Sequence, residues 1–132
     1  MKKKIIAAAA VLALSAGAFY IVRNRNDPGP EPVMLSNSYS REAYLNVKGL
    51  DVTLKCSDKI KIPEKFTGIY EKYAEIQKRQ QLPLENFKGR EAERFLYKIN
   101  SPGDLYAELV TVDGELVSGT ILDYEKQELS AL

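Results

Sequence analysis

The chain has 132 residues, with 19 basic and 18 acidic side chains, one cysteine and no histidine. This length gives room for one small domain, and the lack of histidine excludes Ser–His or Cys–His nucleophile pairs and His-ligated metals. With Cys56 alone, neither an intramolecular disulfide nor a cysteine-rich zinc site can form.

The charges are divided unevenly along the chain. Residues 1–25 carry five basic side chains and no acidic one, so the other 14 basic residues face all 18 acidic ones for a net charge of −4. A mildly acidic domain lacks the clustered basic surface that binding to a phosphate backbone requires. We therefore expect no nucleic acid among the partners.

Residues 5–22 form an uncharged run that follows three lysines. As a helix this run reaches about 27 Å, enough to span a hydrocarbon core. We favour an uncleaved signal-anchor at residues 1–23, because the run continues from Phe19 to Val22, beyond the small residues at 16–18. The alternative is a cleaved signal peptide and a secreted protein. By the positive-inside rule, the N-terminus of the anchored form is cytoplasmic and the bulk of the chain is outside the membrane.

Prolines at alternate positions follow the apolar run, at Pro28, Pro30 and Pro32. This spacing favours an extended, semi-rigid spacer. The chain is thus divided into a transmembrane helix at residues 1–23, a Pro-rich linker at 24–35 and an extracytoplasmic α+β domain at 36–132.

The first part of the domain predicts a short helix and a strand. Polar N-cap residues and the stop at Gly49 bound a helix within residues 36–49, with an apolar stripe at Tyr44, Leu45 and Val47. Residues 50–62 then alternate, with Val52, Leu54 and Cys56 on one face of a half-buried strand that a bulge or turn could interrupt. This pattern predicts that Cys56 is a buried, inert thiol.

Residues 62–89 are the centre of the predicted domain. The helical spacing of the apolar residues predicts an amphipathic helix that starts near Pro63 or Thr67, ends before Pro83 and covers a small sheet. The residues of its buried face are Phe66, Ile69, Tyr70, Tyr73 and Ile76. Leu82, Leu84 and Phe87 are expected to fold back over the core before a turn at Gly89.

Three strands are predicted at residues 90–99, 105–112 and 115–122. In the first of them Phe95, Tyr97 and Ile99 share one face, for which core packing is the favoured interpretation. Asp113-Gly114 between two β-rich runs is typical of a type I′ hairpin turn, and Gly119 indicates a bulge or a close approach of the helix. The acidic tail at 123–132 has no clear pattern and is expected to fray or to form an irregular turn. The predicted fold is α+β, with an antiparallel sheet of about three to four strands packed against one main helix and a shorter one.

Three sets of residues could carry chemistry. The tyrosines could form a binding platform, but the spacing of Tyr70 and Tyr73 favours core packing. Glu91 and Glu93 share a strand face and could act as acid and base, although solvated or cross-strand-paired side chains are the simpler interpretation. The acidic residues around Gly114 lack the spaced carboxylates of a calcium loop. No catalytic, cofactor-binding or metal-binding residue is assigned, and no cofactor or metal is expected.

Five segments of the chain together resemble an uncharacterised family of membrane-anchored domains from Gram-positive bacteria, domain-of-unknown-function family 4830. The segments are KGLDV (48–52), IPEKFTGIYEKYAEIQKRQ (62–80), FKGR (87–90), RFLYKI (94–99) and VDGELVSG (112–119). The resemblance covers residues 36–122 and implies one N-terminal membrane segment and a small α+β ectodomain, with no established activity. Gln81 stands where the family pattern has a glycine at the end of the central helix, and the tail after Leu122 also departs from the pattern.

These features favour a membrane-anchored extracytoplasmic domain of the bacterial cell envelope that acts by binding and not by catalysis. Its expected partners are the membrane, through residues 5–22, and an envelope protein or a cell-wall component. The alternatives are a small hydrolase or transferase that uses carboxylates, or a secreted protein after cleavage of the signal peptide.

Overall fold

A computed structural model describes residues 31–132 of the chain, and Pro32–Leu132 form one compact unit. The predicted membrane segment and most of the predicted linker lie outside the described residues. Within residues 31–132, no helix combines the length and the apolar character that crossing a bilayer requires.

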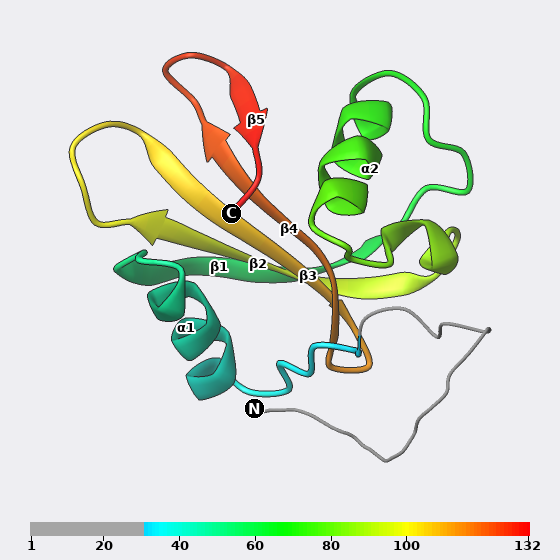
Figure 1. The fold of residues 1–132 in the computed structure, drawn as a ribbon, viewed down its shortest axis with the longest axis horizontal. Coiled ribbons are helices and arrows are strands. Elements are labelled where there is room, and N and C mark those ends of the chain that lie inside the picture. The colour runs from blue at the N-terminus through cyan, green and yellow to red at the C-terminus, as the bar shows by residue number, and fades with distance from the viewer. Residues whose placement is uncertain (1–30) are drawn as a thin grey trace, which may run out of the picture. The chain divides into compact units, whose positions relative to one another are not determined.

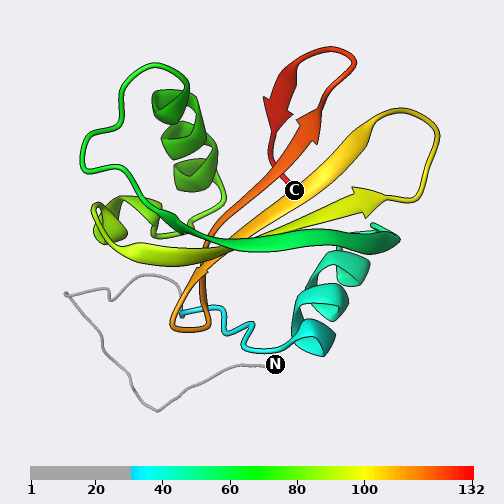
Figure 2. The same cartoon turned by 180° about the vertical axis from the view of Figure 1, so that it is seen from behind.

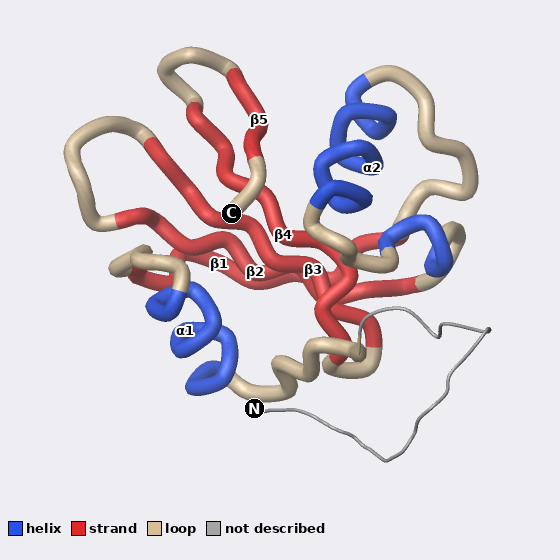
Figure 3. The backbone as a smooth tube through the Cα atoms, viewed as in Figure 1, coloured by secondary structure: helices blue, strands red, loops and turns tan. Residues whose placement is uncertain are grey.

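The described chain folds into two α-helices, a short 3₁₀ helix and five strands (Figures 1 and 3). In chain order the elements are α1 (Ser38–Val47), β1 (Val52–Lys61), α2 (Ile69–Arg79), η1 (Leu84–Phe87), β2 (Glu91–Ile99), β3 (Leu105–Val112), β4 (Glu115–Asp123) and β5 (Glu128–Ser130). The strands form one antiparallel sheet in the order β1-β2-β3-β4-β5, so each strand pairs with its neighbour in sequence. The predicted α+β class is confirmed.

The sheet has five strands, not the three to four that we predicted. The additional strand is β5, which pairs with the end of β4 through Leu122 and Leu129. With three residues, β5 is too short for the alternation of apolar and polar residues to identify it. The tail is therefore ordered against the sheet, where the sequence suggested a frayed or irregular end.

The two faces of the sheet carry separate hydrophobic clusters. The first face is defined by Phe95, Tyr97, Ile99, Ala107 and Leu109, which pack with Leu45 of α1. The second face is defined by Ala92, Arg94, Glu108, Val110 and Ser118, and its cluster includes Ile62 and Leu84. Figures 1 and 2 show α1 beside β1 and α2 beyond β4, near opposite ends of the sheet. The first face was predicted correctly from the alternation of Phe95, Tyr97 and Ile99.

The helix α1 has the capping residues that the sequence indicates. The Asn37 side chain accepts a hydrogen bond from the Ser40 backbone N–H at 2.8 Å, and the Ser40 hydroxyl accepts one from the Asn37 N–H at 3.2 Å. Gly49, with φ of 86°, ends the helix in the left-handed conformation that glycine adopts without steric cost. Leu45 is fully buried, but Val47 is 88% exposed, so the predicted stripe is wrong at that residue.

The helix α2 begins later than predicted, at Ile69. Its N-cap is Gly68, with φ of 60° and ψ of −128°, a conformation that a residue with a Cβ rarely adopts. Upstream of it, the backbone N–H of Ile62 donates to Arg90 and its carbonyl accepts from Gly89, both at 2.9 Å, which extends the pairing of β1 with β2. Pro63 therefore follows a strand instead of opening a helix.

Gln81 occupies the left-handed position at the C-terminus of α2, with φ of 61°. The Leu82 N–H donates to the Gln77 carbonyl at 2.9 Å and the Gln81 N–H to the Lys78 carbonyl at 3.0 Å, which together form a Schellman motif. Gln81 thus has the backbone conformation that suits glycine.

We expect Gln81→Gly to raise the free energy of unfolding by about 0.5 to 1 kcal/mol, because glycine avoids the clash of Cβ in this conformation. Chemical denaturation of the full-length chain measures the change. Glu75→Gly, at an exposed position inside α2, is the control and should lower stability by about 1 kcal/mol. Equal losses in both variants would contradict the assignment of strain to Gln81.

The outer edge of β4 is covered by three other segments. Before β4 pairs with β5, the Val33 carbonyl accepts from the Leu116 N–H at 2.8 Å, and the Leu35 N–H donates to the Gly114 carbonyl at 2.7 Å. The folded unit therefore begins before Ser36. Further along β4, the side chains of Gln77 in α2 and of Gln80, the C-cap of α2, bond the backbone of Gly119. This protection removes an exposed strand edge that could pair with another chain.

Gly119 provides space for Leu132. A Cβ built on Gly119 would lie 2.5 Å from Cδ1 of Leu132, and the Leu132 N–H donates to the Gln80 side chain at 2.9 Å. The predicted close approach at Gly119 thus exists, and it involves the end of the chain and the α2 glutamines. The register shift in the β3–β4 pairing lies earlier, between Val110 and Thr111.

Cys56 is exposed, so the prediction of a buried thiol is wrong. A register shift between Leu54 and Cys56 pairs Leu54 with Tyr97 on the first face and Cys56 with Leu96 on the second. The bulge thus places on opposite faces two residues that simple alternation places together. Most of β1, a strand at the edge of the sheet, is exposed as well.

Candidate functional site

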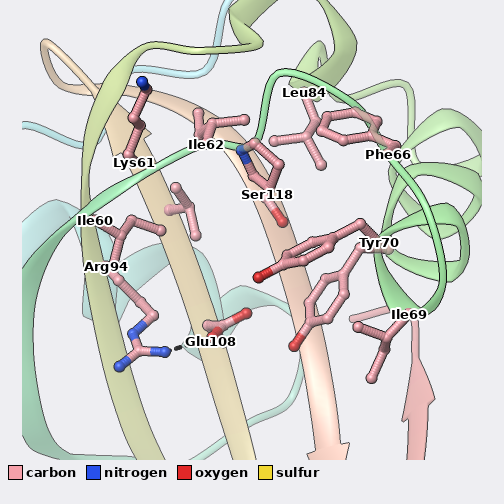
Figure 4. Close-up of a pocket in the computed structure, with 13 residues that line it drawn as sticks. Ile60, Lys61, Ile62, Phe66, Ile69, Tyr70, Leu84, Arg94, Glu108 and Ser118 are labelled. Carbon is pink, nitrogen blue, oxygen red and sulfur yellow. Dashed lines mark ion pairs between the residues drawn. The ribbon is translucent and has the colours of Figure 1, made fainter.

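An open cavity of about 320 Å³ lies between the second face of the sheet and the N-terminal half of α2 (Figure 4). Apolar groups form most of its wall, with Ile60 on the sheet side and Phe66 in the loop that leads to α2. Glu108 and Arg94 supply charged groups on the sheet side, and Ile69 and Tyr70 lie on the helix side. An apolar cavity with a few placed polar groups is the usual form of a binding site.

Glu108 is the buried charged residue of this site, with 6% of its surface exposed. It lies in β3 next to Val110 on the second face and opposite Leu96 of β2. A carboxylate in such surroundings loses much of its hydration, which disfavours the ionised form. Burial accordingly raises the pKa of Glu108, and the charge of Arg94 and a hydrogen bond with Tyr73 act in the opposite direction.

Arg94 links Glu108 to a second carboxylate across the sheet. Its Nε and Nη2 donate to Oδ1 and Oδ2 of Asp58 at 3.1 and 2.9 Å, a bidentate pair between β2 and β1. Its Nη1 lies 3.7 Å from Oε2 of Glu108, which is an ion pair but is longer than a hydrogen bond. The guanidinium is therefore held mainly by Asp58, and its hydrogen-bonding capacity is largely used there.

Tyr73 approaches the carboxylate from α2. Burial raises the pKa of the Tyr73 hydroxyl. The negative charge of Glu108 and the hydrogen bond between Tyr73 and Glu108 raise this pKa further. The Tyr73 hydroxyl is therefore neutral, and able to donate to Glu108, over the whole physiological pH range. Groups from β1, β2, β3 and α2 meet at this point, which explains why no single stretch of sequence marks the site.

The apolar stripe of α2 is divided between the core and the cavity. Ala74, Ile76 and Gln77 are buried, whereas Ile69 and Tyr70 are 56% and 45% exposed and border the cavity. The prediction that Ile69 and Tyr70 are core residues is wrong, because the late start of α2 puts both residues in its first turn, at the opening. We call these two residues the rim. Tyr97, by contrast, is fully buried as predicted.

The other residues that the sequence singled out lie elsewhere. Glu91 and Glu93 are exposed on β2, opposite Lys61 and Lys59 of β1, which agrees with the interpretation of solvated side chains. Asp113 and Gly114 have φ of 50° and 83°, which confirms the type I′ turn. Within residues 31–132, no group of three or more acidic or cysteine side chains is arranged to hold a metal ion.

The raised pKa of Glu108 predicts a pH-dependent stability. Because the folded chain binds the Glu108 proton more tightly than the unfolded chain, stability falls as the pH rises from the unfolded value of about 4.3 through the folded value. Glu108→Gln should flatten the curve in this window, since the amide does not titrate. Urea denaturation at a series of pH values measures the effect.

The control for this prediction is Glu91→Gln, which changes the same functional group at an exposed position. It should keep the slope of the unmodified chain. A slope that is equal in Glu108→Gln and in the unmodified chain would show that Glu108 does not titrate differently in the two states.

Comparisons of the chain with protein-family models, with curated proteins and with solved structures found no match.

Proposed function

We propose that this chain is a membrane-anchored extracytoplasmic domain of the bacterial cell envelope that binds an envelope protein or a wall component without catalysis. The observation that carries the proposal is the open apolar cavity with Glu108 inside it and the rim at its mouth. Large apolar side chains that stay exposed beside a preformed cavity are typical of a contact surface. The apolar run at residues 5–22 supports the location.

A carboxylate-based hydrolase is the weaker alternative. The observation that supports it is the burial of Glu108, since a buried carboxyl with a raised pKa can serve as a general acid. Acid–base hydrolysis needs a second free carboxylate, and Asp58 is bound at both oxygens by Arg94. Glu91 and Glu93 lie outside the cavity lining. The arrangement therefore supports binding better than turnover.

Crosslinking in cells tests the binding function. A photoreactive phenylalanine analogue replaces Tyr70 at the rim, and the same replacement at Tyr39 of α1, which is 82% exposed, is the control. We expect a discrete adduct from position 70 and none of the same mass from position 39. Equal labelling at both positions, or none at position 70, would refute a specific partner at the cavity.

Cell fractionation tests the location. The anchored form should remain with the membrane fraction, and its C-terminal domain should be cleaved by protease added to intact cells whose wall has been removed. A soluble mature form in the medium that begins near Phe19 would instead support cleavage and secretion.

A further inference from the structure

We infer that the cavity binds a primary ammonium group at the end of an apolar stem, the chemistry of a lysine side chain on a partner protein. This inference rests on the proposed function, because it names the group that the partner inserts. It follows from the charges around Glu108, from the unused acceptor capacity of its carboxylate and from the shape of the cavity.

The charges at the cavity do not balance when Glu108 is ionised. Asp58, Arg94 and Glu108 then carry two negative charges and one positive charge, and the positive charge is held by Asp58 through two short hydrogen bonds. The contact of Arg94 with Glu108 is longer, at 3.7 Å. An ammonium group placed at Glu108 would restore neutrality, whereas an anion would meet an uncompensated negative charge.

Glu108 retains unused hydrogen-bonding capacity. A carboxylate can accept about four hydrogen bonds. Within residues 31–132, the polar groups of the protein that face it are the Tyr73 hydroxyl and, through a long ion pair, Arg94. The side chain lines the cavity, so a ligand can supply the missing donors. An ammonium group has three donors and forms charge-assisted bonds, which are stronger than those of a neutral donor.

The cavity also fits an apolar stem. The apolar wall of the cavity includes Ile60, Phe66, Ile69 and Val110. The volume of about 320 Å³ is sufficient for a chain of four methylene groups. Lysine side chains commonly bury this stem while the ammonium group finds a polar partner. The Lys61 ammonium of the cavity lining lies 3.4 Å from Glu64, an exposed acid, so this lysine already has its own partner.

Isoleucine methyl groups allow a direct test by NMR. Ile60, Ile62 and Ile69 line the cavity. Ile99 and Ile121 belong to the first face of the sheet and serve as references. The full-length chain in detergent micelles is titrated with acetyl-Ala-Lys-Ala-amide and with the same peptide carrying norleucine. We expect the lysine peptide to shift the three cavity methyls, with no change at Ile99 and Ile121. The norleucine peptide should bind at least about tenfold more weakly.

Glu108→Gln should lower the affinity for the lysine peptide at least about tenfold and leave the norleucine peptide unaffected. Glu91→Gln is the matched control and should behave as the unmodified chain. Unchanged methyl shifts of Ile99 in the variants show that the fold is retained. Tighter binding of norleucine, or no effect of Glu108→Gln, would overturn the ammonium inference while the cavity remained a binding site.

The pH dependence of binding gives a second measurement that needs no variant. The ammonium group requires ionised Glu108, so affinity for the lysine peptide should fall as the pH drops. The other ionisable groups that face Glu108 are Asp58, Arg94 and Tyr73. The norleucine peptide should show no such fall. If neither peptide shifts the cavity methyls, the ammonium inference fails, and crosslinking at Tyr70 decides separately whether the proposed function fails with it.

Discussion

Replacing Gln77 with leucine should lower the free energy of unfolding by about 3 kcal/mol, because the substitution leaves a buried backbone donor without a partner. Gln77 is 1% exposed, and its Oε1 accepts a hydrogen bond from the Gly119 N–H at 2.9 Å. Its Nε2 donates to the Thr120 hydroxyl, also at 2.9 Å. The Gln77 Oε1 also accepts from Nε2 of Gln80 at 2.9 Å. Leucine fits the volume but replaces none of these bonds, and water has little access to a side chain that is 1% exposed.

Gln80→Leu is the comparison for this prediction. Gln80 bonds the Gly119 carbonyl at 2.7 Å and the Leu132 N–H at 2.9 Å, but its side chain is only partly buried, so water can replace part of what is lost. Urea denaturation of both full-length variants should give a smaller loss for Gln80→Leu. A loss below about 1 kcal/mol for Gln77→Leu would contradict the role of this side chain in closing the edge of β4.

Removing the rim should weaken binding and leave the fold intact. We expect the double variant Ile69→Ser, Tyr70→Ala to lower the free energy of unfolding by no more than about 1 kcal/mol per substitution, since both side chains are about half exposed. Its affinity for the acetylated lysine peptide should fall at least about tenfold, because exposed aromatic and aliphatic side chains at the centre of a contact supply much of the binding energy.

The matched control is Tyr39→Ala, which removes an exposed tyrosine from α1. It should leave both stability and binding unchanged. If the rim variant bound the peptide as well as the unmodified chain did, the contact surface would lie elsewhere. If the rim variant lost several kcal/mol of stability, Ile69 and Tyr70 would be core residues after all.

The strands and turns were the features that the sequence predicted best, because their signals are local. Asp113-Gly114 adopts the positive φ angles that this residue pair favours between two strands. The alternation of Phe95, Tyr97 and Ile99 identified the buried first face, since a strand repeats every two residues. Gly49 marked the end of α1, because glycine readily adopts the left-handed conformation that ends a helix.

The errors arose where tertiary contacts or the backbone changed a local pattern. The bulge after Leu54 moved Cys56 to the second face, and alternation alone does not show where such an extra residue lies. At Gly68, the backbone conformation set the start of α2, although Thr67 and Pro63 are the more usual residues at a helix start. This shift in turn placed Ile69 and Tyr70 at the cavity.

The candidate site was missed although it has a signal in the sequence. Glu108 interrupts the apolar strand at residues 105–112, and it is in phase with Val110 and Val112 on one face. A charged residue at a buried position is uncommon unless it has a partner or a function. Arg94, the partner, is 14 positions away in sequence and becomes a neighbour only through the pairing of β2 with β3.

Footprinting of the rim on intact cells is the most direct test of the central claim that the cavity is where this domain meets its partner. Hydroxyl-radical modification of Tyr70 and Tyr39 is compared between cells and the purified full-length chain, and the two tyrosines report on the cavity and on α1. We expect modification of Tyr70 to fall in cells relative to that of Tyr39, because the partner covers the rim. An equal ratio in cells and in the purified protein would contradict it.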